Sequence, residues 1–389
     1  MPRLKVLHLI TTLPRLSGAA DNTRYTANLL DPDRYTVHLA SGPAGLDQSQ
    51  IAPHVRLIVI PFLVRPAAPV SDLRALWALY RLCARERYDI VHTHNAKAGV
   101  LGRVAARLAG VPVAIHTAHS ISFVASKSRL SNWLYRVLDK ISALLSAKII
   151  TVSEVNTRTY LEARIGRRDQ YVTIYSGIEL EKYEDRSARA DCRREIGVAD
   201  EEVLIVWIGR LNRQKDPITF LRAAKEVVGR VPQARFVMIG EDSLGVTLEP
   251  HVRQIRRDLG LESAVQLLGY RPDVHRFLAA ADLVMHTSLY EGMGRSITES
   301  MVAGVPLVAT AVDGVKEAIV TGQRGGLLAP PRDPAALADA AVRLIEDPAF
   351  CARLTAEGRA WATARFDVRG MVRAIDELYQ NLWKDHQTE

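Results

Sequence analysis

Short runs rich in valine, isoleucine and leucine alternate with amphipathic helical patterns along the whole chain of 389 residues. In the first half the expected strands lie near residues 5–10, 35–40, 55–60, 89–94, 111–117, 148–153 and 171–175, and the helices near 20–30, 71–88, 97–110, 128–146 and 155–164. In the second half the strands are expected near 203–209, 234–240, 265–269, 283–287, 306–311 and 325–328, and the helices near 217–230, 248–260, 273–281, 295–304, 315–320, 334–346 and 349–364. Strands that alternate with helices form parallel sheets with both faces covered. The pattern therefore predicts an α/β protein with two doubly wound, Rossmann-like domains that face each other across a cleft.

The chain is long enough for two domains of ordinary size. We expect the division near the segment Ile174–Tyr183, which gives an N-terminal domain over residues 1–180 and a C-terminal domain over 181–366. The charged run 181–195 that follows is interpreted as a polar connecting segment. Ligands of doubly wound domains bind outside the carboxyl ends of the strands, so the functional residues are expected there.

Composition restricts the class of protein. The apolar content of 48% and the charged content of 24% are typical of a globular protein, and no apolar run reaches the roughly 18 residues of a membrane span. The N-terminal segment lacks the apolar core and cleavage site of a signal peptide. The cysteines Cys83, Cys192 and Cys351 have neither metal-binding nor disulfide spacing. These features together predict a cytoplasmic location.

Positive charge is concentrated in the first half of the chain. Residues 1–180 contain 23 Lys and Arg against 12 Asp and Glu, whereas residues 181–389 contain 28 against 31. No basic patch is interleaved with aromatic residues, so we do not expect nucleic acid as a partner. An anionic membrane surface or a phosphorylated lipid acceptor suits the basic half better, and predicts peripheral contact with the inner face of the membrane.

The helical pattern at 128–146 is the strongest candidate for such contact. It combines the basic residues Arg129, Arg136 and Lys140 with the apolar residues Trp133, Leu134 and Leu138. A helix of this kind can lie on anionic lipid. The apolar residues could equally belong to the core, and the pattern alone leaves both interpretations open.

The segment Ser288–Pro306 contains two acidic residues, Glu291 and Glu299, on either side of a glycine-bearing loop and the start of a helix. Glycine lets a backbone approach a ligand closely, and a helix N-terminus favours anions. The carboxylates could accept hydrogen bonds from sugar and ribose hydroxyls. The residues expected to bind a sugar donor that carries phosphate groups are Gly292, Met293, Gly294, Arg295, Ser296, Ile297 and Glu299. An ordinary capped surface helix would show the same spacing.

Two cations follow the expected strand at 203–209. Arg210 comes directly after Gly209, and Lys215 follows before the next helix. Arginine can bind a diphosphate bidentately and lysine as a point charge. An ordinary basic loop remains the alternative from these residues alone.

These motifs together resemble the donor site of glycosyltransferase family 4, the large family of retaining, nucleotide-sugar-dependent enzymes with the GT-B fold. The family includes sucrose synthase and bacterial mannosyl- and N-acetylglucosaminyltransferases of polysaccharide biosynthesis. The resemblance extends from Val6 to about Leu382, and it rests on the Glu291–Glu299 block, the Gly-Arg-Leu-x-x-x-Lys phrase and the run His-Thr-His-Asn-Ala-Lys-Ala-Gly. It implies that Arg210 and Lys215 hold the donor pyrophosphate, that Glu299 binds the ribose and that Glu291 orients the sugar.

The resemblance assigns further residues to the donor. Gly240 and Glu241 would lie beside the nucleotide, and the backbone of Tyr270 and Arg271 would pair with the base. In the N-terminal domain, Gly18 would lie in the loop beside the sugar, where family members commonly have two adjacent glycines and this chain has Ser17-Gly18. His119 would contact the sugar as a catalytic residue with Arg210, Lys215 and Glu291. The C-terminal helix, residues 367–389, would pack back on the N-terminal domain.

His92 and His94 lie two residues apart on an expected strand and so share a face. Such a pair occurs in metal sites, but no third ligand follows at a recognisable spacing. We therefore expect no metal, and a packing and hydrogen-bonding role for both histidines, with Asn95 and Lys97 at the edge of the cleft. His116 is expected to be structural.

The expected function is that of a retaining, metal-independent glycosyltransferase without a cofactor other than its co-substrate, the nucleotide-sugar. A UDP-sugar is the favoured donor and GDP-mannose the alternative, and the expected acceptor is a saccharide or lipid-linked saccharide of cell-surface glycan synthesis. Two other functions share the fold. A nucleotide-sugar epimerase would need acid/base carboxylates in the first domain, where no clear pair occurs, and a non-catalytic subunit would be expected to lose Arg210, Lys215 or Glu299.

Overall fold

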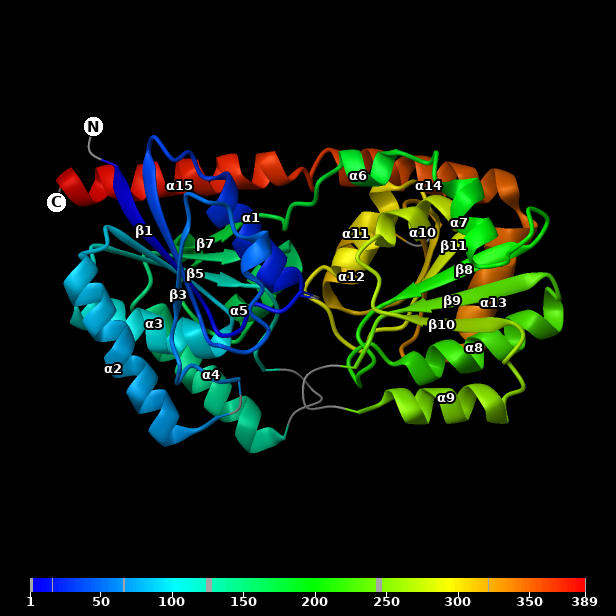
Figure 1. Ribbon diagram of the computed structural model, residues 1–389, viewed down its shortest axis with the longest axis horizontal. Coiled ribbons are helices and arrows are strands. Elements are labelled where there is room, and N and C mark those ends of the chain that lie inside the picture. The colour runs from blue at the N-terminus through cyan, green and yellow to red at the C-terminus, as the bar shows by residue number, and fades with distance from the viewer. Residues whose placement is uncertain are drawn as a thin grey trace. The chain divides into compact units, whose positions relative to one another are not determined.

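The computed structural model describes residues 3–15, 17–65, 67–123, 128–242, 247–320 and 322–388. The chain forms two compact units, one made of Met1–Gly177 with Val368–Glu389 and the other of Ile178–Asp367 (Figure 1). Each unit contains one parallel sheet flanked by helices. The predicted class, α/β with two doubly wound Rossmann-like domains, is confirmed.

The first unit is built on seven parallel strands in the order β3-β2-β1-β4-β5-β6-β7. The strands are β1 Leu4–Ile10, β2 Tyr35–Ser41, β3 Arg56–Val59, β4 Ile90–His94, β5 Val113–Ala118, β6 Lys148–Thr151 and β7 Tyr171–Thr173. The helices are α1 Gly18–Leu29, α2 Pro69–Glu86, α3 Ala96–Leu108, α4 Arg129–Ala143, α5 Glu154–Glu162 and α15 Val368–Thr388, with short 3-10 turns at Gln48–Gln50 and Arg168–Gln170.

Alternation along the central strand β1 divides the core of this unit into two layers. Val6 and Ile10 pack with residues of α1 and α15, whereas Leu7 and Leu9 pack with residues of α2 and α3. Successive side chains of a strand point to opposite faces. His8, between Leu7 and Leu9, therefore lies on the face covered by α15, the helix that closes the chain (Figure 1).

The second unit contains six parallel strands in the order β10-β9-β8-β11-β12-β13. The strands are β8 Val203–Ile208, β9 Ala234–Ile239, β10 Val265–Gly269, β11 Leu283–His286, β12 Leu307–Thr310 and β13 Gly326–Ala329. The helices are α6 Glu181–Glu184, α7 Arg189–Glu195, α8 Pro217–Arg230, α9 Glu249–Asp258, α10 Val274–Ala280, α11 Arg295–Val302, α12 Asp313–Ala318, α13 Pro334–Glu346 and α14 Pro348–Thr363.

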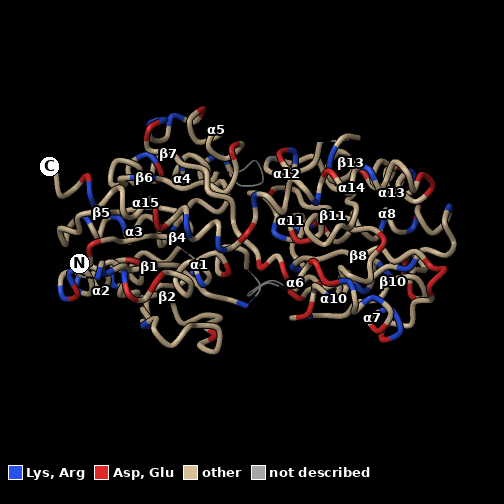
Figure 2. Tube along the Cα trace, turned by 90° about the horizontal axis from the view of Figure 1, so that it is seen from above, with Lys and Arg blue, Asp and Glu red and all other residues tan. Residues whose placement is uncertain are grey.

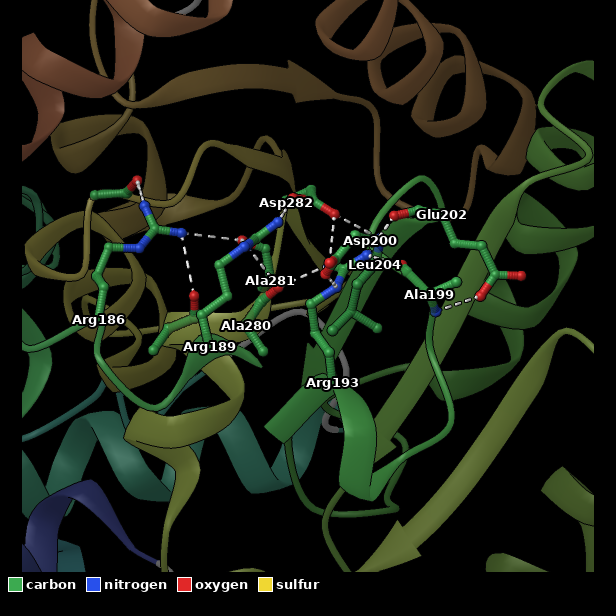
Figure 3. A network of polar contacts seen from close by, with 12 residues as sticks. Arg186, Arg189, Arg193, Ala199, Asp200, Glu202, Leu204, Ala280, Ala281 and Asp282 are labelled. Atoms are coloured by element: carbon green, nitrogen blue, oxygen red, sulfur yellow. Dashed lines mark hydrogen bonds and ion pairs between the residues drawn. The ribbon is translucent and has the colours of Figure 1, made fainter. Parts of the chain in front are cut away.

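The charged run at 181–195 is more than the polar connection that the sequence predicted. It forms α6 and α7, and the side chain of Arg193 is only 1% exposed. Figure 3 shows how Arg193, Arg189 and Arg186 converge on the segment Ala280–Asp282, directly before β11. Helix α7 is therefore part of the folded unit, because its arginines satisfy carbonyl and carboxylate oxygens of another segment.

The Arg193 guanidinium makes most of the bonds in this network. It donates to the carboxylate of Asp282 at 3.1 Å and to the carbonyl oxygens of Ala280, Ala199 and Glu202 at 3.1, 2.5 and 2.5 Å. The Asp282 carboxylate also accepts a bond from the amide of Leu204 at 2.8 Å, which ties β8 to the same network. Figure 2 shows basic and acidic positions interspersed around α7.

None of the helices in the described part of the chain combines the length and apolar character needed to cross a membrane. Apolar side chains do reach the surface of the first unit. The exposed ones on its helices α2 and α4 are Val70, Leu73, Trp77, Leu130, Trp133, Leu134 and Ile141. The interpretation that Trp133 and Leu134 belong to the core is therefore wrong. Leu138, the third apolar residue of that pattern, is half-buried.

Candidate donor site and the histidine cluster

The strand order of the second unit identifies where a ligand would bind. The chain runs outward from β8 to β9 and β10, and then returns to the other side of β8 as β11. In doubly wound sheets the crevice at such a reversal, at the carboxyl ends of the strands, is the usual ligand site. Lys215 follows β8 and Glu291 follows β11, so the two residues lie on either side of the reversal.

Lys215 and Glu291 form a buried ion pair at this position. The Nζ atom of Lys215 lies 2.6 Å from Oε1 of Glu291, and the Ser288 hydroxyl donates to the same oxygen at 2.8 Å. His286, at the end of β11, lies 3.7 Å from that oxygen. Lys215 is held in place by the turn that precedes α8, where Asp216 caps the helix and Pro217 occupies its first turn.

These contacts determine the charge of the pair. Burial by itself would raise the pKa of Glu291, but the charge of Lys215 and the bonds from Lys215 and Ser288 outweigh it and lower the pKa. Burial, assisted by the charge of Lys215, lowers the pKa of His286 to about 3. At neutral pH the site therefore holds an ionised carboxylate, an ammonium group and a neutral imidazole.

The loop Gly292–Gly294 leads into the N-terminus of α11, as the sequence predicted. Gly294 has a φ of 83°, a left-handed conformation that favours glycine, and no side chain caps the helix. The hydroxyl of Ser296 is buried without a hydrogen-bond partner. The next residue, Ile297, is fully buried in the core. An uncapped helix start beside an unsatisfied hydroxyl is suited to phosphate oxygens.

Glu299 lies one turn into α11, where it is buried and doubly bonded. Its Oε1 atom accepts a bond from Nε of Arg295 at 2.6 Å and another from the hydroxyl of Tyr183 at 2.9 Å. Tyr183 was not predicted as a site residue, because it lies in the segment interpreted as a connection. Ser288 and His286 were also missed, although their places at and just beyond the end of β11 could have suggested them.

Two glycines bring the ends of β8 and β9 into close contact. A Cβ atom on Gly240, whose φ is 143°, would lie 1.8 Å from the carbonyl oxygen of Gly209. The amide of Leu211 also bonds to the carbonyl of Glu241 at 2.8 Å. The partly buried Arg210 lies between these contacts in the chain, at the carboxyl end of β8.

Tyr270 and Arg271 follow β10, next to β9 in the sheet. The guanidinium of Arg271 is held by both carboxylate oxygens of Asp273 at 2.8 Å and by Glu195 at 2.9 Å. The Arg271 side chain is thus engaged within the protein. The backbone of the two residues remains the part predicted to contact a base.

In the first unit, Gly18 and His119 are placed by β1 and β5. Gly18 is the first residue of α1, whose N-cap is Ser17, and does not lie in the preceding loop as the sequence predicted. His119 follows β5 directly, and its Nε2 atom lies 3.1 Å from Nδ1 of His94. Burial lowers the pKa of His119 to about 3, so the imidazole is neutral.

The structure provides the third histidine that the sequence pattern lacked. His8 on β1 joins His92 and His94 on β4, and one nitrogen of each lies within 4.8 Å of the others. The cluster contains no carboxylate, and each of its nitrogens that faces a neighbour is already in a hydrogen bond with a histidine or a hydroxyl. This arrangement suits a hydrogen-bonded network of neutral imidazoles better than a cation site.

The remaining predicted residues of this region are structural in their contacts. His116 is buried and bonds to the hydroxyl of Thr93 at 3.0 Å. Lys97 forms an ion pair with Asp72 on α2 at 2.6 Å. Asn95 has a φ of 66° and opens α3 without a side-chain cap.

Comparison with known protein families gives two matches that follow each other along the chain. Residues 16–182 match the model described as Glycosyltransferase Family 4, and residues 202–347 match the model described as Glycosyl transferases group 1. The two matches account for most of both units.

Comparison with individual proteins agrees with these matches. The chain is 29% identical over 348 residues to the UDP-Gal:alpha-D-GlcNAc-diphosphoundecaprenol alpha-1,3-galactosyltransferase of Escherichia coli, which covers 89% of each chain. It is also 29% identical to the D-inositol 3-phosphate glycosyltransferase of Acidothermus cellulolyticus, over 77% of this chain and 69% of that protein.

Among solved structures, Alr3699/HepE of Anabaena in complex with UDP and glucose superimposes with a TM-score of 0.82 at 25% identity, over 97% of this chain and 100% of that one. Sucrose-phosphate synthase of Thermosynechococcus elongatus superimposes with a TM-score of 0.86 at 22% identity, over 98% of this chain and 100% of that one, which shows a common fold.

Proposed function

The chain belongs to the family-4-type nucleotide-sugar glycosyltransferases with the GT-B fold, and on this premise we propose that it is a retaining, metal-independent hexosyltransferase that uses a UDP-sugar. The observation that supports this most strongly is the Lys215–Glu291 pair at the strand reversal, beside the uncapped start of α11. A cation, a helix N-terminus and an ionised carboxylate there match the diphosphate and the sugar of such a donor.

The second unit would supply electrostatic catalysis. Lys215, Arg210 and the N-terminus of α11 would stabilise the negative charge that grows on the departing diphosphate. The anomeric carbon would form a bond to the acceptor oxygen as its bond to the phosphate oxygen breaks. The proton of the acceptor hydroxyl would pass to that phosphate oxygen, which needs no metal and no covalent enzyme intermediate.

Glu291 is better suited to orienting the sugar than to attacking it. Its Oε1 atom is already engaged by the ammonium group of Lys215 and the hydroxyl of Ser288. A carboxylate neutralised in this way is a weak nucleophile. Glu299, held by Tyr183 and Arg295, would accept hydrogen bonds from the ribose.

The relatives suggest the donor and the acceptor. The galactosyltransferase of Escherichia coli is named for UDP-Gal and for an acceptor linked to diphosphoundecaprenol, and the HepE structure contains UDP and glucose. We therefore propose a UDP-hexose donor and a lipid-linked saccharide acceptor for this chain. GDP-mannose is the alternative donor.

An acceptor-dependence assay tests this function. The protein is incubated with UDP-glucose, UDP-galactose, UDP-N-acetylglucosamine or GDP-mannose, with and without a GlcNAc-diphosphopolyprenol, and nucleotide release and the anomeric configuration of the product are measured. We expect UDP release only with the acceptor, an α-linked product from an α-linked donor, and unchanged rates in EDTA. Interconversion of sugars without an acceptor would indicate an epimerase, and loss of activity in EDTA that Mn²⁺ or Mg²⁺ restores would contradict metal independence.

A lipid-linked acceptor requires access to a membrane surface, and we propose that α2 and α4 of the first unit provide it. Both helices pack against α3, on the same face of the sheet (Figure 1). Trp77 on α2 is 60% exposed and Trp133 on α4 is 61% exposed, and exposed apolar neighbours accompany each. Tryptophans beside basic side chains are typical of surfaces that lie at the lipid interface.

Basic side chains surround these apolar ones. Arg129, Arg136 and Lys140 are exposed on α4, and Arg136 stacks over the ring of Phe123 at 4.9 Å. Helix α2 contributes the exposed Arg74 and Arg81. The sequence pattern identified only α4. In α2 the exposed apolar residues recur with the same helical period as the buried ones, so the pattern does not distinguish the two sets.

Charge reversal on α4 tests the membrane surface. The variant Arg129→Glu/Arg136→Glu/Lys140→Glu should bind vesicles that contain anionic phospholipid at least tenfold more weakly, since each basic residue near such a surface contributes about 1 kcal/mol. Vesicle co-sedimentation at low salt measures the effect, and nucleotide affinity should not change. Reversal of Arg158, Arg164 and Arg168, which are exposed elsewhere in the same unit, is the matched control. Equal vesicle binding by wild type and the α4 variant would exclude this surface.

A further inference from the structure

Three neighbouring strands of the first unit bring a set of polar side chains onto one face of the sheet. In the register of β1 with β4, His8 is opposite His92, and in the register of β4 with β5, His94 is opposite Thr117. The apolar neighbours on this face pack against α15, whose Tyr379 is completely buried. The polar set therefore lies between the sheet and the C-terminal helix.

These side chains form one continuous series of hydrogen bonds. The Tyr379 hydroxyl lies 3.4 Å from Nε2 of His8, Nδ1 of His8 lies 3.2 Å from Nε2 of His94, and Nδ1 of His94 lies 3.1 Å from Nε2 of His119. We name Tyr379, His8, His94 and His119 the histidine chain. A branch leaves it at Tyr379, whose hydroxyl lies 2.6 Å from Nδ1 of His92.

The branch ends on β5. The Nε2 atom of His92 lies 2.7 Å from the hydroxyl of Thr117. Chain and branch thus use both ring nitrogens of His8, His92 and His94. His8, His92, His94 and His119 all lie in the described part of the chain. Of their ring nitrogens, only Nδ1 of His119 has no hydrogen-bond partner within this network.

The imidazoles of the histidine chain are neutral. Burial lowers the pKa of His8 and of His119 to about 3, and it lowers the pKa of His94 and His92 well below the ordinary value. No carboxylate takes part in these bonds. A neutral imidazole has one N–H donor and one acceptor nitrogen, so each ring can donate once and accept once.

This restriction couples the proton positions of all the rings. If His119 donates from Nε2 to His94, then His94 must donate to His8 and His8 to Tyr379, and Nδ1 of His119 is an acceptor. If the order is reversed, Tyr379 donates to His8 and every later ring donates toward His119, whose Nδ1 then carries the proton. Within the histidine chain only these two arrangements satisfy every bond, and they differ in what His119 offers to a ligand.

We propose that Tyr379 on the C-terminal helix fixes the tautomer of His119 through His8 and His94, and so decides whether Nδ1 of His119 donates to or accepts from the transferred sugar. Tyr379, His8 and His94 are thus positioning residues. The inference rests on the proposed function and on the role that the family resemblance implies for His119, a contact with the donor sugar. It gives the C-terminal helix a part in the reaction that packing alone would not require.

The test is to remove one hydroxyl from the far end of the histidine chain. In Tyr379→Phe, the phenylalanine ring keeps the packing, but the histidine chain loses the hydroxyl at its end. Nothing at that end then favours one proton arrangement over the other, so the two arrangements approach equal population. We expect the ¹⁵N resonances of the His119 ring, assigned with His119→Asn, to move toward the average of the two tautomers. We also expect kcat to fall about twofold with little change in KM for the donor, because only about half of the molecules then hold the productive tautomer of His119.

Tyr35→Phe is the matched control. Tyr35 is also buried against α15, where its hydroxyl bonds to Asp376 and Gln380, but it is not part of the histidine chain. This control should leave the His119 resonances and kcat close to those of wild type. If Tyr379→Phe does not fold, His8→Leu interrupts the same series of hydrogen bonds from the strand side.

The outcomes separate this inference from the proposed function. Unchanged His119 resonances in Tyr379→Phe would overturn the coupling, and shifted resonances with an unchanged kcat would overturn its role in turnover. The resonances are measured on the protein without substrate. Shifted resonances in a protein without transferase activity would therefore support the coupling and reject the proposed function.

Discussion

Replacement of Lys215 by methionine is expected to lower kcat about 10²- to 10³-fold, because a preorganised donor to a developing anion contributes that much to the rate. The apolar stem of Lys215 packs against Gly209, because its Cγ atom lies 3.1 Å from where a Cβ atom on that glycine would be. Methionine retains this apolar stem. Initial rates of UDP release with donor and acceptor at saturation measure the loss. The exposed Lys225 on α8 provides a control, and Lys225→Met should keep the wild-type rate.

The same variant should change how stability depends on pH. In wild type the pKa of Glu291 is lowered, so the pair stabilises the fold above the ordinary carboxyl pKa and this contribution is lost as the pH falls through the lowered value. Without Lys215, burial raises the pKa of Glu291 above its value in the unfolded chain. The variant should therefore lose stability as the pH rises, and its deficit relative to wild type should be larger at pH 8 than at pH 5.

A double variant separates charge from catalysis. Lys215→Met/Glu291→Gln removes the unpaired carboxylate and should recover much of the stability at pH 8, while the rate stays low. Thermal unfolding at the two pH values measures this. Near-normal turnover in Lys215→Met would remove Lys215 from the diphosphate site, and an equal stability deficit at both pH values would mean that the pair is not buried as described.

Arg193→Met is expected to lower the free energy of unfolding of the second unit by about 2–3 kcal/mol, because it removes a buried charged donor and leaves carbonyl oxygens without a hydrogen bond. The side chain of Arg193 is 1% exposed, and its loss leaves the carbonyl oxygens of Ala199 and Glu202 without this donor. Urea unfolding followed by tryptophan fluorescence is suitable, because Trp207 lies in the core of this unit.

The neighbouring Arg194 is the natural control for Arg193. Its side chain is 78% exposed and pairs only with Asp191 on the same helix turn, among the contacts described. Arg194→Met should therefore change stability by no more than about 0.5 kcal/mol, as is usual for exposed pairs. Equal effects of the two variants would show that α7 is not an integral part of the second unit.

The order of helices and strands could be predicted from the sequence because it depends on local periodicity. The alternation at 203–209, 217–230 and 234–240 appears in the structure as β8, α8 and β9 with nearly the same bounds. The grouping of Lys215 with Glu291 was also within reach, because residues that follow parallel strands meet at one edge of a sheet. The ion pair between them follows from the strand order, which places β8 next to β11.

Burial of charged residues was not predictable from the same patterns. The run that contains Arg193 is polar by composition, and it folds against the second sheet only because Asp282 and several carbonyl oxygens from distant segments satisfy the guanidinium. Tyr183 reaches Glu299 for the same reason, across 116 positions of sequence. In contrast, Trp133 has the composition of a core residue and is exposed.

The sequence by itself determined the fold class and the residues that follow each strand, because both depend on the short-range periods of strands and helices. Only the tertiary structure decided that His8 lies beside His94, that His94 lies beside His119 and that Tyr379 closes the series. These residues are separated by 86, 25 and 371 positions. They meet because β1, β4 and β5 are neighbours in the sheet and α15 returns to cover it, and that non-local pairing is not encoded in any single segment.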